Sequence, residues 1–243
     1  MKTLCLDFGN TRLKAAIFED NRFAEELYLT DDSTSTLEEL LKKYQPQRSI
    51  LSSVINHNEA IEEVLAAGTV FHKLSPATKL NFVSPVGKPE TIGADRLALI
   101  AAAVHFYPGK NSLVIGLGSC ITYNFVNQYN QFLGGSISPG MDMLFRSMHD
   151  FTAKLPLVQA DWNFPLIGYD TKTNLQSGVI TGMACEIEGF IEKYEGKYSN
   201  FNVLLTGGNS AYFASQLKNK IFADHHFLFK GLYALSELNN CPA

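Results

Sequence analysis

The sequence has little of what a nucleic-acid-binding or membrane protein needs. Its 20 Lys and Arg residues are outnumbered by 24 Asp and Glu residues, and no basic run exceeds two residues. Because nucleic-acid binding needs clustered basic side chains, we expect no nucleic-acid partner. The longest apolar run, Leu97 to Val104, has eight residues, whereas a membrane-spanning helix needs roughly 20. We therefore expect no membrane partner either.

Cysteine and secretory signals are also scarce. The four cysteines lie far apart and form no CxxC pair, which argues against a zinc ribbon, a dithiol redox motif and a disulfide scaffold. Asp7 interrupts the apolar start of the chain before a signal-peptide core could form. With 46% apolar and 18% charged residues, the composition is that of a globular protein, which we expect to be reduced, soluble and cytoplasmic.

Several common catalytic motifs are missing. The sequence contains no GxxxxGK[ST] phosphate loop, no GxGxxG dinucleotide fingerprint, no GxSxG nucleophile elbow and no HExxH metal box. These absences argue against the P-loop and Rossmann nucleotide folds, the serine hydrolases and the zinc proteases.

The apolar pattern predicts an α/β fold. A strand at 3–6, a tight turn at 7–10 and a return strand ending at Phe18 form a hairpin. Thr34 or Ser35 is the expected cap of the first helix, and the proline-rich stretch 74–90 is expected to be a loop. Further helices are predicted at 36–44, 58–67, 96–106, 141–150 and 175–194, and further strands at 49–54, 113–115, 121–126 and 202–205.

Residues 4–10 and 113–119 match without a gap at an offset of 109 residues in their apolar positions and central glycine. A match this short also arises by chance between two hairpins. Because helices follow each copy, we interpret it as a two-lobed repeat. The predicted lobes are residues 1–108 and 109–243, with their turns facing a shared cleft.

Glycine-bearing turns follow three apolar strands, at 7–11, 116–119 and 206–209. Such turns allow backbone N–H groups to point at anionic oxygens, although each one could also be an ordinary hairpin. The first turn says more, because the carboxylate of Asp7 ends an apolar strand and needs a cation or hydrogen bonds there. Magnesium bound to phosphate would supply that cation.

Five ordered motifs resemble those of one family. The segment Asp7-Phe8-Gly9-Asn10-Thr11-Arg12-Leu13-Lys14 matches DxGNTxxK, and Gly93-Ala94-Asp95-Arg96 matches GxDR. Residues 134–140 match GGxIxPG, residues 171–182 match TxxxxQSGxxxG with Thr171 in the lead, and residues 206–208 match the adenosine-side turn. Together they resemble the type III pantothenate kinases of the acetate/sugar kinase–Hsp70–actin superfamily. The resemblance implies two ribonuclease H-like lobes of actin-like ATPase type with a central cleft.

The resemblance also implies an activity and a site. The activity is ATP-dependent phosphorylation of pantothenate to 4′-phosphopantothenate, the first step of coenzyme A synthesis, by a homodimer. Asp95 is the implied general base, and Asp7 would hold Mg²⁺ through water. The implied pantothenate-binding residues are Gly93, Ala94, Asp95, Arg96 and Thr171, and the implied ATP-binding residues are Asp7, Phe8, Gly9, Asn10, Thr11, Arg12, Leu13, Lys14 and Ser119.

The chain departs from the family pattern at two places. Gly116 stands where relatives carry an Asp that binds an activating monovalent cation, K⁺ or NH₄⁺. We therefore expect the cation requirement to be altered or absent. The stretch 85–89 also lacks a Tyr that the family often places before its GxDR motif.

Other interpretations of these residues stay open at this point. Asp95 could simply cap the helix that follows it, Arg96 could be a solvated surface charge, Thr171 a loop threonine and Asn10 a turn residue. The chain could be a regulatory homologue, like those first named Bvg accessory factors, or a kinase for another small alcohol. The intact pair of Asp95 and Arg96 favours a kinase whose substrate carries a carboxylate.

Overall fold

The computed structural model describes residues 1–85 and 91–240. Most of the stretch 85–89, in which the family tyrosine is missing, lies outside the described residues, as does Cys241. The chain forms two compact units: the first contains residues 1–109, 126–134 and 226–243, and the second contains residues 110–125 and 135–225. The division of the chain into lobes 1–108 and 109–243 stays a prediction. The first unit also contains segments that follow residue 109.

The first unit is built on a mixed sheet of five strands in the order β3-β2-β1-β4-β5. The predicted hairpin is confirmed, because β1 and β2 pair antiparallel with Asp7 opposite Lys14. Strand β4 runs parallel to β1, so the carboxyl ends of these two strands meet at one edge of the sheet. The strands are β1 (Lys2–Phe8), β2 (Leu13–Glu19), β3 (Arg22–Leu29), β4 (Arg48–Ser53) and β5 (Val70–Lys73).

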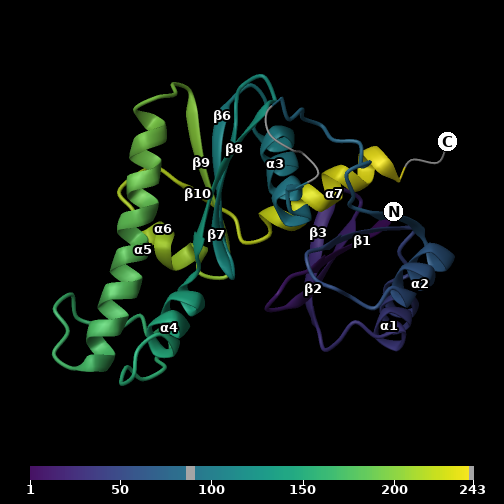
Figure 1. Cartoon of the computed structure of the whole chain (residues 1–243). Coiled ribbons are helices and arrows are strands. Elements are labelled where there is room, and N and C mark those ends of the chain that lie inside the picture. The colour runs from purple at the N-terminus through teal and green to yellow at the C-terminus, as the bar shows by residue number, and fades with distance from the viewer. Residues whose placement is uncertain (86–90, 241–243) are drawn as a thin grey trace. The chain divides into compact units, whose positions relative to one another are not determined.

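Helices cover both faces of this sheet (Figure 1). Helices α1 (Thr34–Tyr44) and α2 (Ala60–Gly68) bury one face, and their core contains Leu6, Phe8, Leu37, Ile61 and Leu65 at 0% exposure. On the other face α7 (Phe227–Asn239) contacts β1 and β4, and α3 (Ala94–Phe106) packs against α7 and β4. Two expectations need correction: Ser33, rather than Thr34 or Ser35, caps α1 by accepting the Thr36 N–H, and α7 was not foreseen.

The second unit is built on another five-stranded sheet, in the order β10-β9-β6-β7-β8. The long helix α5 (Thr171–Glu195) runs along it, and the Tyr123 ring of β7 stacks on Phe190 of α5 at 3.9 Å. The strands are β6 (Asn111–Leu117), β7 (Cys120–Val126), β8 (Phe132–Pro139), β9 (Phe201–Gly207) and β10 (Phe222–Ala223), and the remaining helices are α4 (Met141–Asp150) and α6 (Ser210–Gln216).

The two sheets have the same topology. Reading the second order as β8-β7-β6-β9-β10 reproduces β3-β2-β1-β4-β5 strand for strand. The matching segments 4–10 and 113–119 therefore occupy the same position, at the end of the central strand of each sheet. No helix in the described part of the chain has both the length and the apolar character needed to cross a membrane.

Candidate active site

The first of the three glycine-bearing turns, residues 7–11, is called the first phosphate turn below. It begins at the end of β1, at the edge of the sheet where β1 and β4 end. Its backbone is closed by the Gly9 N–H, which donates to the Arg12 carbonyl at 3.1 Å. The side chains of Asn10, Thr11 and Arg12 are exposed. The turn thus presents two neutral donors and a cation to solvent beside the buried Phe8.

Asp7 lies in a row of cross-strand neighbours. It stands opposite Ser52 of β4 on one side and Lys14 of β2 on the other. The Ser52 hydroxyl donates to Oδ1 of Asp7 at 3.4 Å. The pKa of Asp7 is raised to about 7, mainly by burial and then by the charge of Asp95, while Lys14 and the Ser52 hydrogen bond offset part of the rise.

Asp95 and Arg96 occupy the first turn of α3. The residue that caps α3 is Gly93, without a side-chain hydrogen bond, so the interpretation of Asp95 as the helix cap is wrong. Burial raises the pKa of Asp95, while the Arg96 backbone N–H and the Arg96 charge lower it. Arg96 is not a fully solvated charge: burial lowers its pKa, and its guanidinium carbon lies 5.8 Å from the centre of the Phe132 ring.

Gly93 leaves room for the carboxylate of Asp95. A Cβ at this position would lie 2.6 Å from Oδ1 of Asp95 and 3.9 Å from Cγ1 of Val54. Val54 follows β4, and its N–H donates to the Phe8 carbonyl at 3.0 Å. The start of α3 is therefore fitted against the same sheet edge that carries Asp7.

A surface hollow of about 370 Å³ lies beneath the first phosphate turn. It is lined by the turn, by the end of β3 and by one residue after β4: Gly9, Asn10, Thr11, Arg12, Leu13, Tyr28, Leu29, Thr30 and Ile55. Neither Asp7 nor Asp95 is among them. The hollow thus offers donors without a carboxylate, which suits an anionic group.

Lys14 already has a partner. Its Nζ donates to Oε1 of Glu26 at 2.9 Å and lies 5.2 Å from the centre of the Tyr28 ring. Nδ1 of His226 lies 3.1 Å from the other Glu26 oxygen. Glu26, Ser52 and His226 were not singled out from the sequence. The place of Ser52 at the end of the buried strand β4 could have indicated it, but nothing local to Glu26 or His226 connects them to Lys14.

The second glycine-bearing turn, residues 116–119, is called the second phosphate turn below. It belongs to the second unit. Gly116 ends the apolar part of β6 opposite Thr206 of β9, and Ser119 follows in the turn between β6 and β7, half-buried. Gly140 packs against this turn: its N–H donates to the Ser119 carbonyl at 3.1 Å, and a Cβ there would overlap the Gly118 carbonyl. Residues 134–139 of the GGxIxPG segment lie in β8.

Thr171 is the first residue of α5 and is exposed, so it is not a loop threonine. Asp170 caps the helix in a capping box with Thr173. The buried motif residues Gln176 and Ser177 donate to the carbonyls of Gln159 and Leu166 at 3.1 and 2.6 Å. They hold the segment before α5 in place.

The donor set around Asp7 fits a magnesium ion that is bound together with phosphate. No group of three or more His, Cys, Asp or Glu side chains in the described residues is arranged to hold a metal ion by itself. Mg²⁺ commonly uses one or two carboxylates, waters and phosphate oxygens. A cation here would also lower the pKa of Asp7, which burial and then the charge of Asp95 raise.

Solved structures with the same fold cover nearly the whole chain. A Campylobacter jejuni protein described as a Baf family transcriptional activator superposes with a TM-score of 0.61 at 20% identity, covering 97% of this chain and 98% of its own. A glucokinase from an Antarctic psychrotroph gives 0.54 at 9% identity, covering 98% and 99%. These likenesses confirm the expected α/β fold of sugar kinases and actin-like ATPases.

The sequence comparisons are more specific. The family model of the type III pantothenate kinases matches residues 3–193. The type III pantothenate kinase of Christiangramia forsetii is 41% identical, covering 97% of this chain and 98% of its own. That of Bacteroides fragilis strain YCH46 is 40% identical and covers 98% of both. On the ordered motifs, the fold and these matches together, the chain belongs to the type III pantothenate kinase family.

Proposed function

We propose that this protein is a pantothenate kinase that transfers the γ-phosphoryl group of ATP to the primary hydroxyl of pantothenate, in coenzyme A synthesis. The observation that carries the proposal is that Asp7 and Asp95 converge on one turn: Val54, just after β4, donates to the carbonyl of Phe8, and its Cγ1 faces Gly93 at the start of α3. The charge of Asp95 contributes to the raised pKa of Asp7. A kinase of this kind needs one carboxylate for the acceptor hydroxyl and another near the phosphate groups. Asp95 and Asp7 supply both within one compact unit.

Asp95 is the proposed general base. As the acceptor oxygen forms its bond to the γ-phosphorus and the bond from that phosphorus to the bridging oxygen of ADP breaks, Asp95 takes the hydroxyl proton. Its raised pKa makes the carboxylate a better proton acceptor than a solvated aspartate. Arg96 would hold the pantothenate carboxylate. Gly93 and Ala94 leave room there, and Thr171 would contribute a hydroxyl.

The turn Gly9–Leu13 and the hollow beneath it would bind phosphate oxygens through backbone N–H groups and the side chains of Asn10 and Thr11. Ser119 would supply a further hydroxyl. Asp7 would hold Mg²⁺ through water, and the ion would neutralise charge on the phosphate groups. Because Lys14 donates a hydrogen bond to Glu26, we propose that Lys14 offsets the charge of Asp7 and does not bind phosphate.

Gly116 gives the site no carboxylate for a monovalent cation. A backbone carbonyl alone is a weak substitute for the charge of an aspartate. We therefore propose that the activity does not depend on K⁺ or NH₄⁺.

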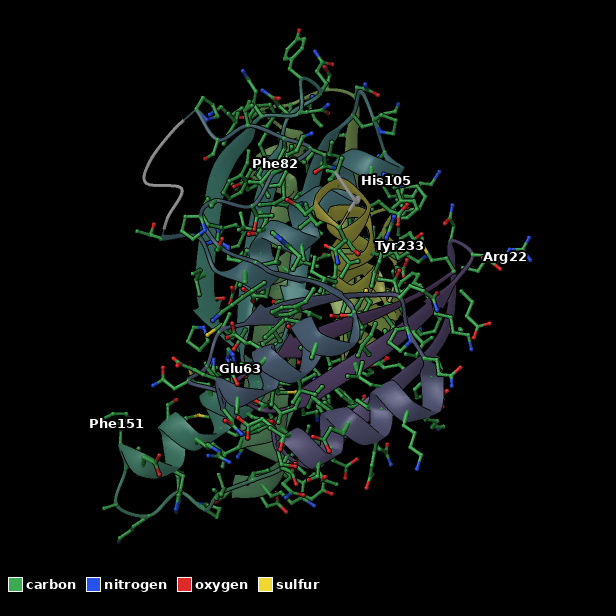
Figure 2. The ribbon with its side chains drawn as sticks, turned by 90° about the vertical axis from the view of Figure 1, so that its right-hand side faces the viewer. Arg22, Glu63, Phe82, His105, Phe151 and Tyr233 are labelled. Carbon is green, nitrogen blue, oxygen red and sulfur yellow. The ribbon has the colours of Figure 1, made fainter. Side chains whose placement is uncertain are left out.

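We also propose a homodimer. Around α4 and the segment that leads to α5, large apolar side chains are exposed: Phe151 by 88%, Ile167 by 85% and Tyr169 by 81%, with Leu157 and Leu166 more than half exposed. Figure 2 shows Phe151 projecting away from the ribbon. Exposed apolar patches of this kind commonly mark protein–protein contacts. Light scattering should give the mass of two chains, and Phe151→Ser with Ile167→Ser should give the mass of one.

The test of the activity is an acceptor panel. Purified protein with ATP and Mg²⁺ should produce ADP and a phosphorylated product with pantothenate, and little with glucose or glycerol. Turnover of a sugar without turnover of pantothenate would favour the other small-alcohol kinase. Absence of turnover with every acceptor, together with capture of a specific protein or DNA partner, would favour the regulatory homologue.

A further inference from the structure

Three side chains near the end of β4 form a hydrogen-bonded chain that the proposed reaction does not use. Nδ1 of His57 lies 2.8 Å from the Ser53 hydroxyl, and Nε2 of the same ring lies 2.8 Å from Oε1 of Glu62 on α2. The His57 side chain is only 5% exposed. Lys73 of β5 pairs with the same Glu62 oxygen at 2.6 Å. Ser53, His57 and Glu62 are called the relay below.

The relay is not arranged as a nucleophilic triad. In serine hydrolases the serine lies on Nε2 of the histidine and the carboxylate on Nδ1, whereas here the two are exchanged. The Ser53 hydroxyl also lies 3.1 Å from the Ile55 carbonyl, within its own turn. Because an ionised carboxylate only accepts hydrogen bonds, Nε2 of His57 carries a proton toward Glu62. The relay therefore fixes the turn 53–57 to α2.

That turn contacts the chain next to both members of the proposed acid pair, Asp7 and Asp95. Val54 donates to the carbonyl of Phe8, next to Asp7, and its Cγ1 faces Gly93, two residues before Asp95. Ile55 lines the hollow under the first phosphate turn. The His57 ring meets the buried Phe8 ring edge to face, with centroids 5.9 Å apart. A shift of this one turn would change the spacing of Asp7 and Asp95.

We propose that His57 is a positioning residue for phosphoryl transfer, which acts through the relay to hold the turn 53–57 and with it the spacing between Asp7 and Asp95. The inference rests on the proposed function of that acid pair. Small displacements of a catalytic group lower the rate of the chemical step while leaving substrate contacts in place. Loss of the relay should therefore lower kcat much more than it raises the KM for ATP.

Variants at the outer end of the relay test this without removing the buried ring. Glu62→Ala breaks the relay, and Glu62→Gln keeps an oxygen that can accept from Nε2. We expect Glu62→Ala to lower kcat about tenfold and Glu62→Gln to restore most of it. Ser53→Ala breaks the other end and should behave like Glu62→Ala. Lys73→Met removes the other partner of Glu62 and should change kcat by less than about twofold.

A second readout needs no turnover. The start of α3 reports on the turn, because Cγ1 of Val54 faces Gly93. In NMR spectra of the ligand-free protein, the amide signals of Gly93 and Asp95 should move in Glu62→Ala and Ser53→Ala and stay in place in Lys73→Met. A merely structural role would reduce the folded fraction without moving these signals.

The two proposals fail separately. If the wild type does not phosphorylate pantothenate, the proposed function is lost, while the amide signals of Gly93 and Asp95 still report on the relay. If the wild type is active and both relay variants keep its kcat and these signals, the positioning role of His57 is wrong. A loss of kcat that only follows the folded fraction, with unmoved signals, would overturn it as well.

Discussion

Asp95, in the first turn of α3, lies close enough to Asp7, at the end of β1, for the charge of one carboxylate to raise the pKa of the other. The two residues are 88 positions apart in the sequence. They meet because β4 runs parallel to β1 and Val54, just after β4, supports the start of α3. Two like charges in a partly buried environment raise the free energy of the folded state. The pair therefore lowers the stability of the ligand-free protein.

The first prediction concerns the stability of the ligand-free protein. The pKa of Asp7 rises from an ordinary 3.8 to about 7 on folding, so between these values the folded chain binds more protons than the unfolded chain. The free energy of unfolding therefore falls as the pH rises from 5 to 8. Asp7→Asn should remove this loss and be more stable than the wild type at pH 8 by about 4 kcal/mol.

Urea unfolding at pH 5 and pH 8, without Mg²⁺, measures the effect. Asp95→Asn should show a smaller pH dependence than the wild type, because it removes one of the two charges that raise the pKa of Asp7. Parallel pH profiles for the wild type and Asp7→Asn would show that Asp7 is solvated and uncoupled.

The second prediction concerns substrate choice. Arg96→Met should lower kcat/KM for pantothenate by about 10- to 100-fold, the range for a lost hydrogen bond to a charged group. It should leave the weaker activity on pantothenyl alcohol, which has no carboxylate, nearly unchanged. Arg48→Met, which removes a cation bonded to Glu237 at 2.6 Å, is the matched control. An equal loss on both substrates in Arg96→Met would argue against a carboxylate-binding role.

The third prediction concerns the second phosphate turn. Gly140→Ala places a Cβ against the carbonyls of Gly118 and Ser119, so the turn must shift. We expect the KM for ATP to rise at least about tenfold, since a misplaced binding group loses most of a charged hydrogen bond. Gly189→Ala on α5, where a Cβ meets nothing within 4 Å, should leave the KM unchanged and stabilise the helix by up to about 1 kcal/mol. Equal KM values in both variants would remove this turn from the ATP site.

The fourth prediction concerns monovalent cations. Because Gly116 brings no charge to the end of β6, replacing K⁺ by Na⁺ or a bulky organic cation should leave the rate within about twofold, the range of changes that disturb no specific site. Gly116→Asp should introduce a dependence on K⁺. A wild type that requires K⁺ would show that other oxygens replace the missing carboxylate.

Local patterns in the sequence were enough to predict the first hairpin, α3, α4 and the repeat. The short run Thr3–Leu6 and the turn residues Gly9 and Asn10 predict β1 and β2 directly, and the structure confirms their pairing. The gapless match of 4–10 with 113–119 was interpreted as a two-lobed repeat, and the two sheets have equivalent strand orders. In each case the signal lies within one short segment.

What the sequence did not reveal depends on contacts between distant segments. Strand β3 alternates weakly, and α7 buries most of an apolar segment that carries no cap signal. Glu26 reaches Lys14 and His226 only because β3 pairs with β2 and the chain returns to the first unit at its end. Asp95 could be singled out only through the GxDR motif. Its position before a predicted helix also fitted an ordinary helix cap.

The most direct test of the acid pair is the rate of phosphoryl transfer in Asp95→Asn. With ATP, Mg²⁺ and pantothenate at saturation, kcat should fall at least about 100-fold, as expected for loss of a general base. The KM for ATP should change little, and the Tm should not fall, since the variant removes a charge that repels Asp7. Asp142→Asn, which alters an exposed aspartate in the first turn of α4, should keep the wild-type rate. Full activity in Asp95→Asn would contradict the account, because the proton would then have another acceptor.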